Sequence, residues 1–420
     1  MEELKKFILS YRIPVIFILL AVCLYCFLYT IGIVNNIPDS NNLLQWDSGW
    51  YKSVSDLGYQ FKPDQQSNTA FFPLFPYIWK LTHLGIGKMS LFNYCIYIFS
   101  IGLINYYFKL SKQAVVFCMT LPSLFFMITP YTEALFFLFG VLISIGYFRQ
   151  KYWLLFLGIF LSCLTRSASN LFLPALIFAE LVTGIYRKSA REIMINIIKV
   201  ILPVILAIAI VNIIQHYQTG VWFAYSKTLK YWNIVFGMPN YPFKTWGGYK
   251  LLWLDAPAFF ISVMAAVLVF MMAYKVIVKH RPVTYNPLTV FVFSTLALYV
   301  PWVLFYKYGD CFSINRYIYC SPFLVIIAGL YFRMGKATIF FRNFSIIAVI
   351  AFSALFITRF GDYGYYSTFP YLVALALYLY LTLKMREKQI RTSYFWAYAC
   401  LNLVIQLYMF NAFMHSVWVG

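Results

Sequence analysis

Charged residues are scarce in this sequence. Only 11% of the 420 residues are Asp, Glu, Lys or Arg, whereas 62% are hydrophobic and the mean hydropathy is +0.74. Soluble domains usually carry about 25% charged residues. The composition therefore excludes a soluble globular domain, a disordered chain, a collagen-like repeat and a small disulfide scaffold. Long apolar runs that recur through such a chain predict a polytopic α-helical membrane protein.

Acidic residues are the rarer charged type. The chain has 13 Asp and Glu against 33 Lys and Arg, a formal net charge of +20. In a soluble protein this excess would suggest nucleic acid as a partner. No basic run here is longer than a loop flanking a helix, so no nucleic-acid partner is expected. The basic residues are instead typical of loops held on the cytoplasmic side of a membrane against anionic lipid.

Motifs for nucleotides and metals are missing. There is no Walker motif, no Gly-rich dinucleotide fingerprint after a strand and no Asp-x-Asp pair, and the four histidines are scattered. Most of the eight cysteines fall in or beside apolar runs, where a thiol behaves as a small buried hydrophobe. We therefore expect no cofactor and no metal, and no metal-bound nucleotide sugar as a donor.

Hydropathy and loop charge predict eleven to thirteen transmembrane helices in one integral membrane domain, residues 1–420. The basic N-terminus precedes a retained first helix and is expected in the cytoplasm. Alternating the sides of the loops puts 21 of the 33 Lys and Arg on that side. The thirteen candidate spans are about 13–34, 89–108, 113–129, 132–148, 152–165, 169–186, 195–215, 256–274, 287–305, 317–332, 340–357, 370–383 and 394–413.

Two long segments fall on the other side of the predicted membrane. These are the first extracytoplasmic loop, 35–88, and a second long loop, 216–255, whereas every cytoplasmic loop is short. Binding and chemistry are often carried by long loops on a rigid scaffold. The sequence therefore predicts that the working face is extracytoplasmic.

The first of these loops contains an acid among aromatic residues. Asp47 lies between Trp46 and Trp50, and Tyr51 follows. Partial desolvation raises the basicity of such an acid, which suits a general base that takes a proton from an alcohol. The three aromatic rings offer flat faces for a sugar. An interfacial aromatic belt with an Asp that caps a short helix explains the pattern equally well.

A second candidate is Glu133, which follows Tyr131 at the predicted outer end of two apolar spans. A carboxylate at such a position is costly unless it faces protein or a wet cavity, so we treat it as a functional candidate. The alternatives are that it stabilises the start of the next helix, pairs with Arg166, or hydrogen-bonds an acceptor.

The third candidate group is basic. Arg166 and Arg316 each stand at the predicted outer end of a span. The planar guanidinium suits phosphate oxygens, so these two side chains could hold a lipid-linked phosphate. Lys307 is a weaker candidate for the same phosphate, and Asp310 is a weaker candidate for the acceptor. Snorkelling or contact with lipid headgroups is the alternative for both arginines.

Taken in order, these motifs resemble the PIG-V family, which contains the second mannosyltransferase of GPI-anchor synthesis and many bacterial homologues. The matching pieces are Trp46-Asp47-x-x-Trp50-Tyr51, Phe72-Pro73-Leu74-x-Pro76, Pro122-Ser123 followed by Tyr131-x-Glu133, Arg166-Ser167, and Arg316-Tyr317 with Pro322.

The resemblance implies a GT-C fold, with the active site at the outer membrane face. Members transfer a sugar from a polyprenyl phosphate, typically mannose from dolichol-phosphate mannose, and invert the anomeric centre. An Asp of the first outer loop usually serves as the base, which maps to Asp47. Eukaryotic members follow the Arg-Ser pair with Asn-Gly, whereas Ala168-Ser169-Asn170 follows here. A bacterial plasma-membrane enzyme with another acceptor therefore fits better.

The sequence thus predicts an inverting glycosyltransferase with a polyprenyl-phosphate sugar donor and a hydroxyl-bearing glycolipid, glycan or protein acceptor. Asp47 and Glu133 are the catalytic candidates, and the donor phosphate is assigned to the basic residues. Acceptor or sugar contacts are assigned to Trp46, Trp50, Tyr51, Tyr131 and Asp310. The alternatives are a surface-polysaccharide polymerase or ligase with a lipid-linked donor, a lipid or sugar transporter, and a non-catalytic membrane scaffold.

Overall fold

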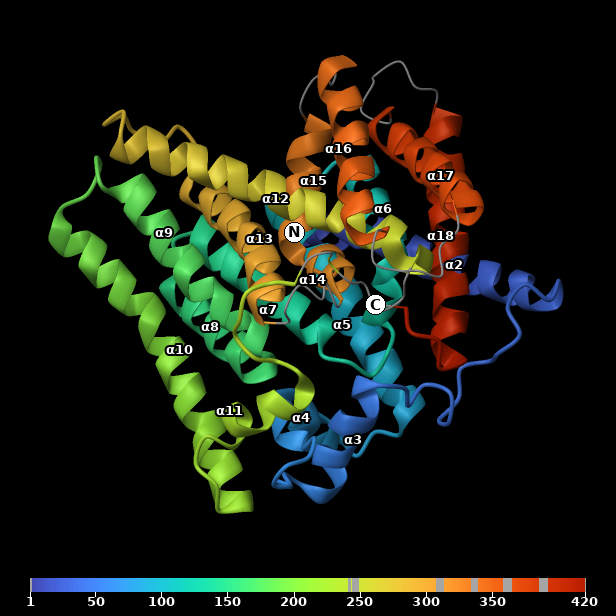
Figure 1. The fold of residues 1–420 in the computed structure, drawn as a ribbon, viewed down its shortest axis with the longest axis horizontal. Helices are drawn as coiled ribbons and strands as arrows, with labels where there is room; N and C mark the ends of the chain where they lie inside the picture. Colours follow the sequence, from blue (N-terminus) through green and yellow to red (C-terminus); the bar gives the residue numbers. More distant parts are fainter. Residues whose placement is uncertain are drawn as a thin grey trace.

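The computed structural model describes residues 2–240, 243, 249–306, 313–333, 339–357, 365–384 and 392–419. Within these ranges the chain consists of helices and connecting segments, and no strand occurs (Figure 1). The predicted all-α class is confirmed. The elements are α1 Glu2–Ser10, α2 Arg12–Thr30, α3 Asp47–Leu57, η1 Asn68–Ala70, α4 Leu74–Thr82, α5 Ile86–Phe108, α6 Lys112–Thr120, η2 Pro122–Met127, α7 Glu133–Phe148, α8 Tyr152–Thr165, η3 Ser167–Leu171, α9 Phe172–Gly184, α10 Ala190–Thr219, α11 Ala224–Thr228, η4 Leu229–Trp232, α12 Tyr249–Ile277, α13 Pro287–Tyr306, α14 Ile314–Tyr319, α15 Pro322–Arg333, α16 Ile339–Ile357, α17 Tyr365–Lys384 and α18 Thr392–Met414.

In the described part of the chain, seven helical segments are long and apolar enough to cross a membrane. This identifies a multi-pass membrane protein. Shorter apolar helices, among them α7 and α8, complete the bundle. The seven segments are Glu2–Thr30, Ile86–Phe108, Ser167–Gly184, Ala190–Thr219, Leu251–Ile277, Pro287–Tyr306 and Ser393–Met414.

Two of the predicted spans are interrupted. The span predicted at 113–129 is wrong as a single helix, because α6 ends at Thr120 and the short 3-10 helix η2 follows from Pro122. Proline lacks an N–H and disfavours helical geometry in the residue before it, and Leu121 is extended, with ψ of 131°. The span predicted at 317–332 is likewise divided between α14 and α15, and Pro322 begins the second helix.

These two interruptions lie against each other in the protein interior. The Ser123 hydroxyl donates to Asn315 Oδ1 at 3.1 Å, and the Cys320 thiol donates to the Ser123 carbonyl oxygen at 3.3 Å. All residues of η2 are buried. The breaks before Pro122 and Pro322 therefore bring two short helices, η2 and α14, together inside the bundle.

Helices α7 and α8 form a close antiparallel pair, and α8 also packs on α10 (Figure 1). Glycine permits this approach, because a Cβ at Gly146 would lie 2.5 Å from the backbone nitrogen of Leu155. Glu133 begins α7 and Thr165 ends α8, so both lie at one end of the pair, which we call the Glu133 end. The other end of the pair is the Tyr147 end.

The segment that leads into α3 is held by the last helix. Asn411 Oδ1 of α18 accepts hydrogen bonds from the backbone N–H groups of Asn35 and Asn36, at 3.2 and 3.1 Å. The Tyr25 hydroxyl donates to the Asn36 carbonyl oxygen at 2.6 Å. These contacts fix the chain eleven and twelve residues before Asp47 against α2 and against α18, which is far away in the sequence.

Replacing Asn411 by Ala is expected to lower stability by about 1–3 kcal/mol, because two backbone N–H groups lose their acceptor in a partly buried place. Thermal unfolding of the purified protein in detergent, followed by size exclusion, measures the effect. Asn212→Ala is the matched control, since among the described residues the Asn212 side chain bonds the Ile208 carbonyl oxygen of its own helix and no other group. Equal melting temperatures for the two variants would contradict the prediction.

Candidate active site

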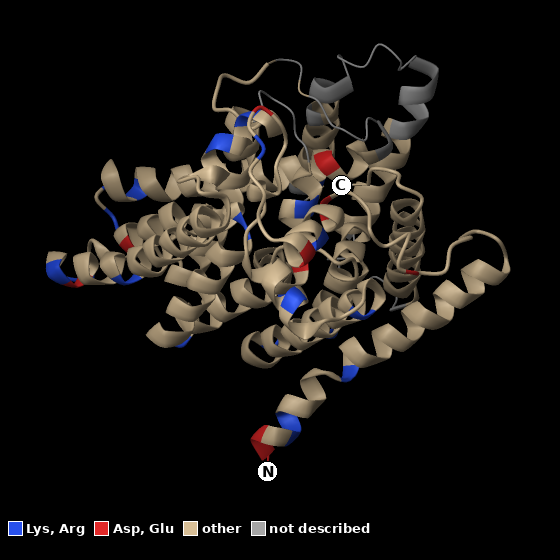
Figure 2. Cartoon of the chain, turned by 90° about the horizontal axis from the view of Figure 1, so that it is seen from below, with Lys and Arg blue, Asp and Glu red and all other residues tan. Residues whose placement is uncertain are grey.

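Four charged side chains from separate parts of the chain meet at the Glu133 end. Glu133 Oε1 accepts hydrogen bonds from Arg166 Nη1 and from Arg316 Nε. Arg316 Nη2 also donates to Asp47 Oδ2 at 3.0 Å. Figure 2 shows acidic and basic segments close together near the middle of the cartoon. We call Asp47, Glu133, Arg166 and Arg316 the charge network.

Each member is placed by an end of a helix or by a short helix. Asp47 and Glu133 are the first residues of α3 and α7, and Arg166 follows the last residue of α8 in extended geometry. Arg316 belongs to the six-residue helix α14, which ends just before the break at Pro322. The Asp47 carboxylate bonds Arg316 rather than the start of α3, where Trp46 occupies the cap position without a side-chain hydrogen bond.

The four members of the charge network differ in how deeply they are buried. The Glu133 side chain is fully buried, those of Arg316 and Arg166 are 3% and 11% exposed, and that of Asp47 is 27% exposed. Two carboxylates balance two guanidinium groups, which lowers the cost of burying all four. Asp47 is therefore the member that a molecule from outside reaches most easily.

Aromatic rings cover both guanidinium groups. Arg316 lies 4.7 Å from the ring centroid of Tyr131 and 5.0 Å from that of Phe126. Arg166 lies 5.1 Å from the centroid of Tyr317 and 5.6 Å from that of Phe136. Cation–π contacts of this kind are stronger in desolvated places, so the rings help to fix both cations.

The charge state of Arg316 follows from its neighbours. Burial alone would lower its pKa, but the carboxylates of Glu133 and Asp47 outweigh burial and hold the pKa well above its ordinary value. Arg316 is therefore a permanent cation fixed between two acids.

Tyr51 and Tyr131, predicted to contact the acceptor or sugar, are buried instead, with 5% and 1% of their surfaces exposed. The Tyr131 hydroxyl donates to the Gln45 carbonyl oxygen at 3.2 Å and accepts from the Asp47 N–H at 3.3 Å. The Tyr51 hydroxyl lies 3.2 Å from Thr132 Oγ1. Burial raises the pKa of both tyrosines, so both stay protonated. Their observed contacts support the backbone beside Asp47 and Glu133.

The two predicted sugar-stacking tryptophans have aromatic neighbours. Trp50 stacks on Phe71 at 6.0 Å and meets Trp232 edge-on at 5.0 Å. Trp46 is 41% exposed and meets Trp418, near the C-terminus, edge-on at 5.1 Å. Trp46 therefore keeps an accessible surface directly beside Asp47. The other two candidates, Lys307 and Asp310, lie outside the described residues.

The backbone at Trp46 is unusual for a bulky residue, with φ of 52° and ψ of −118°. Positive φ costs free energy for residues with a Cβ, and such strain persists where the surroundings enforce it. The bonds of Tyr131 to the residues on both sides, and the contact with Trp418, supply that enforcement.

Sequence reasoning missed a second polar cluster beside Arg316. Asn315 Nδ2 donates to Asp255 Oδ1 at 2.7 Å, and the Asn315 N–H donates to the same oxygen at 3.4 Å. Asp255 is only 2% exposed. Hydropathy places it at the end of the second long loop, but it lies within α12. Its position just before a long apolar run was the available signal, because an acid at a span is rare and functional by default.

Within the described ranges, no group of three or more His, Cys, Asp and Glu side chains could hold a metal ion.

No family model, no curated protein and no solved structure matches this chain. The resemblance to the PIG-V family stays a prediction from the motif residues.

Proposed function

We propose that this protein is an inverting glycosyltransferase that moves a single mannose-like sugar from a polyprenyl phosphate to a hydroxyl acceptor at the extracytoplasmic membrane face. One observation carries the proposal. The Asp47 carboxylate is partly exposed and is held 3.0 Å from a buried, permanently charged arginine. An oriented carboxylate next to fixed cations at an apolar helix bundle suits proton removal and phosphate departure in one place.

Asp47 supports the proposal as the general base. Its Oδ2 is engaged by Arg316, and no described residue donates a hydrogen bond to Oδ1. Oδ1 takes the proton of the acceptor hydroxyl while the acceptor oxygen forms a bond to the anomeric carbon. The bond from that carbon to the phosphate oxygen breaks, and its electron pair leaves with the phosphate. Phosphate is a good leaving group, so this step needs no general acid.

Inversion separates the roles of the two arginines. The base and the leaving phosphate must lie on opposite faces of the sugar, so the phosphate lies away from Asp47. Arg166 is connected to Asp47 only through Glu133 and Arg316, and it is the more exposed arginine. We therefore assign the phosphate to Arg166 and the orientation of the base to Arg316.

Arg166 also has N–H donors for which no hydrogen bond to a described residue is present. A guanidinium carries five N–H donors, and one described bond of Arg166, to Glu133, uses its Nη1. Fixed N–H donors in a poorly hydrated site stabilise the charge that develops on a departing phosphate.

Arg166→Lys is expected to raise the donor KM about tenfold or more, because a lysine keeps the charge but loses the planar fork. The acceptor KM should change little. Steady-state transfer with a polyprenyl-phosphate sugar, varied at fixed acceptor, measures both constants. Arg149→Lys is the control, since Arg149 lies at the Tyr147 end and packs on Tyr107. An unchanged donor KM would remove Arg166 from the phosphate site.

The function itself is tested with the wild-type protein in detergent or vesicles, polyprenyl-phosphate mannose as the donor and an alkyl mannoside as the acceptor. We expect a new glycosidic bond of inverted configuration, formed equally well with EDTA present. Transfer only from a lipid-linked oligosaccharide would favour the polymerase or ligase. Movement of the donor across vesicles without any new bond would favour the transporter.

A further inference from the structure

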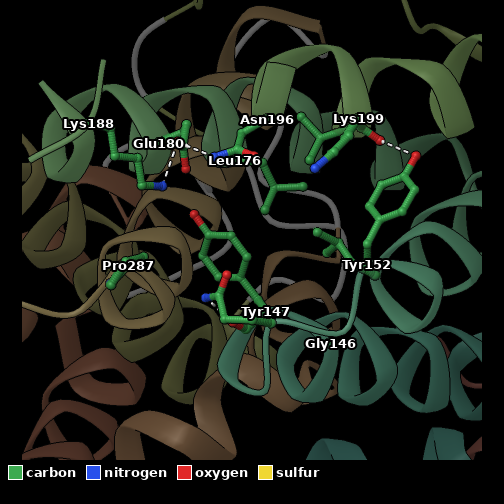
Figure 3. Close-up of a pocket in the computed structure, with 12 residues that line it drawn as sticks. Gly146, Tyr147, Tyr152, Leu176, Glu180, Lys188, Asn196, Lys199 and Pro287 are labelled. Atoms are coloured by element: carbon green, nitrogen blue, oxygen red, sulfur yellow. Dashed lines mark hydrogen bonds and ion pairs between the residues drawn. The ribbon is translucent and has the colours of Figure 1, made fainter. Parts of the chain in front are cut away.

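A polar cavity lies at the Tyr147 end (Figure 3). Its volume is about 120 Å³, and it lies among the α7–α8 turn, α9 and α10. Tyr147 is about four turns along α7 from Glu133, roughly 21 Å at 1.5 Å per residue. The cavity therefore forms a separate site. Its polar lining comes from Tyr147, Gln150, Tyr152, Glu180, Lys188, Asn196 and Lys199.

Three of the polar lining residues already bond one another. Glu180 Oε1 accepts hydrogen bonds from Lys188 Nζ at 2.6 Å and from Asn196 Nδ2 at 2.8 Å. One cation of the cavity is therefore neutralised by its only acidic lining residue. Lys199 remains, and no described carboxylate lies within ion-pair distance of it.

Two polar groups of the cavity, the Tyr147 hydroxyl and the Lys199 amine, have no hydrogen-bond or ion-pair partner among the described residues. The Tyr147 hydroxyl is buried and has no hydrogen-bond partner in the described ranges, and Figure 3 shows it pointing toward the side of Glu180 and Lys188. A buried hydroxyl without a partner costs free energy. The Lys199 amine lies 5.6 Å from the centroid of the Tyr152 ring. A donor hydroxyl and an ammonium in one cavity fit an anionic oxygen ligand.

The surroundings of the cavity are strongly basic. Arg149 and Lys151 lie in the α7–α8 turn, and Arg187 and Arg191 flank the start of α10. The predicted topology places this end on the cytoplasmic side, where anionic lipids are abundant. Basic pockets between membrane helices on that side are suited to anionic headgroups.

The outside of the bundle next to the cavity is apolar. On α10, Ile195, Ile198 and Leu202 are 41%, 56% and 45% exposed, and on α8 Trp153 is 62% exposed. Lipid chains can cover such a surface in a membrane, whereas a free phosphate ion gains nothing from it. The combination of a basic cavity with an adjoining apolar face distinguishes a lipid from a soluble anion.

We propose that this cavity binds the phosphate of an anionic phospholipid, with Lys199 and the Tyr147 hydroxyl as donors and the acyl chains along α8 and α10. The cavity far exceeds the 10–15 Å³ that one water needs, so a phosphate oxygen can enter. The site is independent of the proposed glycosyl transfer.

The test uses the full-length protein in nanodiscs of equimolar phosphatidylglycerol and phosphatidylcholine, followed by extraction and native mass spectrometry of the lipid that stays bound. We expect wild-type protein to retain phosphatidylglycerol over phosphatidylcholine by about fivefold. Lys199→Gln should lower the retained phosphatidylglycerol about fivefold, and Tyr147→Phe about two- to tenfold.

Lys151→Gln is the matched control, because it removes one charge from the same end but does not line the cavity. Its retained lipid should stay within about twofold of wild type. Equal retention of both lipids by wild-type protein would overturn the proposal without any variant. If Lys151→Gln and Lys199→Gln lose the same amount of retained phosphatidylglycerol, the lipid binding is explained by general surface charge and not by the cavity. Release of the lipid by inorganic phosphate alone would assign the cavity to the free ion.

Discussion

Replacing Asp47 by Asn is expected to lower kcat for glycosyl transfer by about 10²–10⁴-fold, the usual effect of losing a general base. Asn has nearly the same shape, and its amide oxygen still accepts the bond from Arg316 Nη2. What is lost is the capacity to take a proton from the acceptor hydroxyl. The donor KM should therefore stay close to the wild-type value, while turnover falls.

Single-turnover transfer from a polyprenyl-phosphate sugar measures this effect free of product release. Asp56→Asn is the control, because Asp56 lies on the same helix but pairs with Lys52 at the surface and does not contact the charge network. It should keep full activity. Glu133 is a poor substitute base, since it is buried and bound to two arginines. Wild-type turnover in Asp47→Asn would remove Asp47 from this role.

Much of the site could be predicted from the sequence because charge is costly inside a membrane protein. Glu133, Arg166 and Arg316 stand at the ends of apolar runs, where a charge needs a partner. The predicted alternative in which Glu133 pairs with Arg166 is confirmed. Asp47 could be selected for its unusual neighbours, two tryptophans and a tyrosine.

The contacts among these residues could not be predicted, because they join positions up to 269 residues apart. Local periodicity says nothing about which helix ends meet. For the same reason, the hold of Asn411 on the segment before Asp47 and the contact of Trp418 with Trp46 were missed. Hydropathy windows also averaged over the breaks at Pro122 and Pro322, although each proline was a visible local signal.

The burial of the aromatic side chains could not be predicted from the sequence either. Tyr51 and Tyr131 resemble sugar-contacting residues by type and position, but whether a ring faces solvent depends on the helices packed around it. Here Phe71 and Phe75 enclose Tyr51, and Phe126 with Phe413 encloses Tyr131. Burial is a property of tertiary packing, so composition and spacing leave it open.

Replacing Glu133 by Gln is expected to lower the stability of the folded protein by about 3–5 kcal/mol, the range for removing one partner of a buried ion pair. Gln can accept a hydrogen bond but cannot balance the charge of Arg166 and Arg316, which are 11% and 3% exposed. Thermal unfolding in detergent should show a far larger loss for Glu133→Gln than for Asp47→Asn, whose side chain is partly exposed.

A second substitution tests whether the stability loss of Glu133→Gln comes from the unbalanced charge rather than from general misfolding. In Glu133→Gln with Arg166→Gln, Asp47 and Arg316 remain as a balanced pair, so the double variant should regain part of the stability that Glu133→Gln loses. Each arginine alone is less critical, because Glu133 keeps the other as a partner. Losses that simply add in the double variant would contradict the coupling. Because Glu133 bonds both arginines whether or not substrate is present, its loss should lower stability and turnover together. Loss of the partly exposed Asp47 should lower turnover with a much smaller loss of stability.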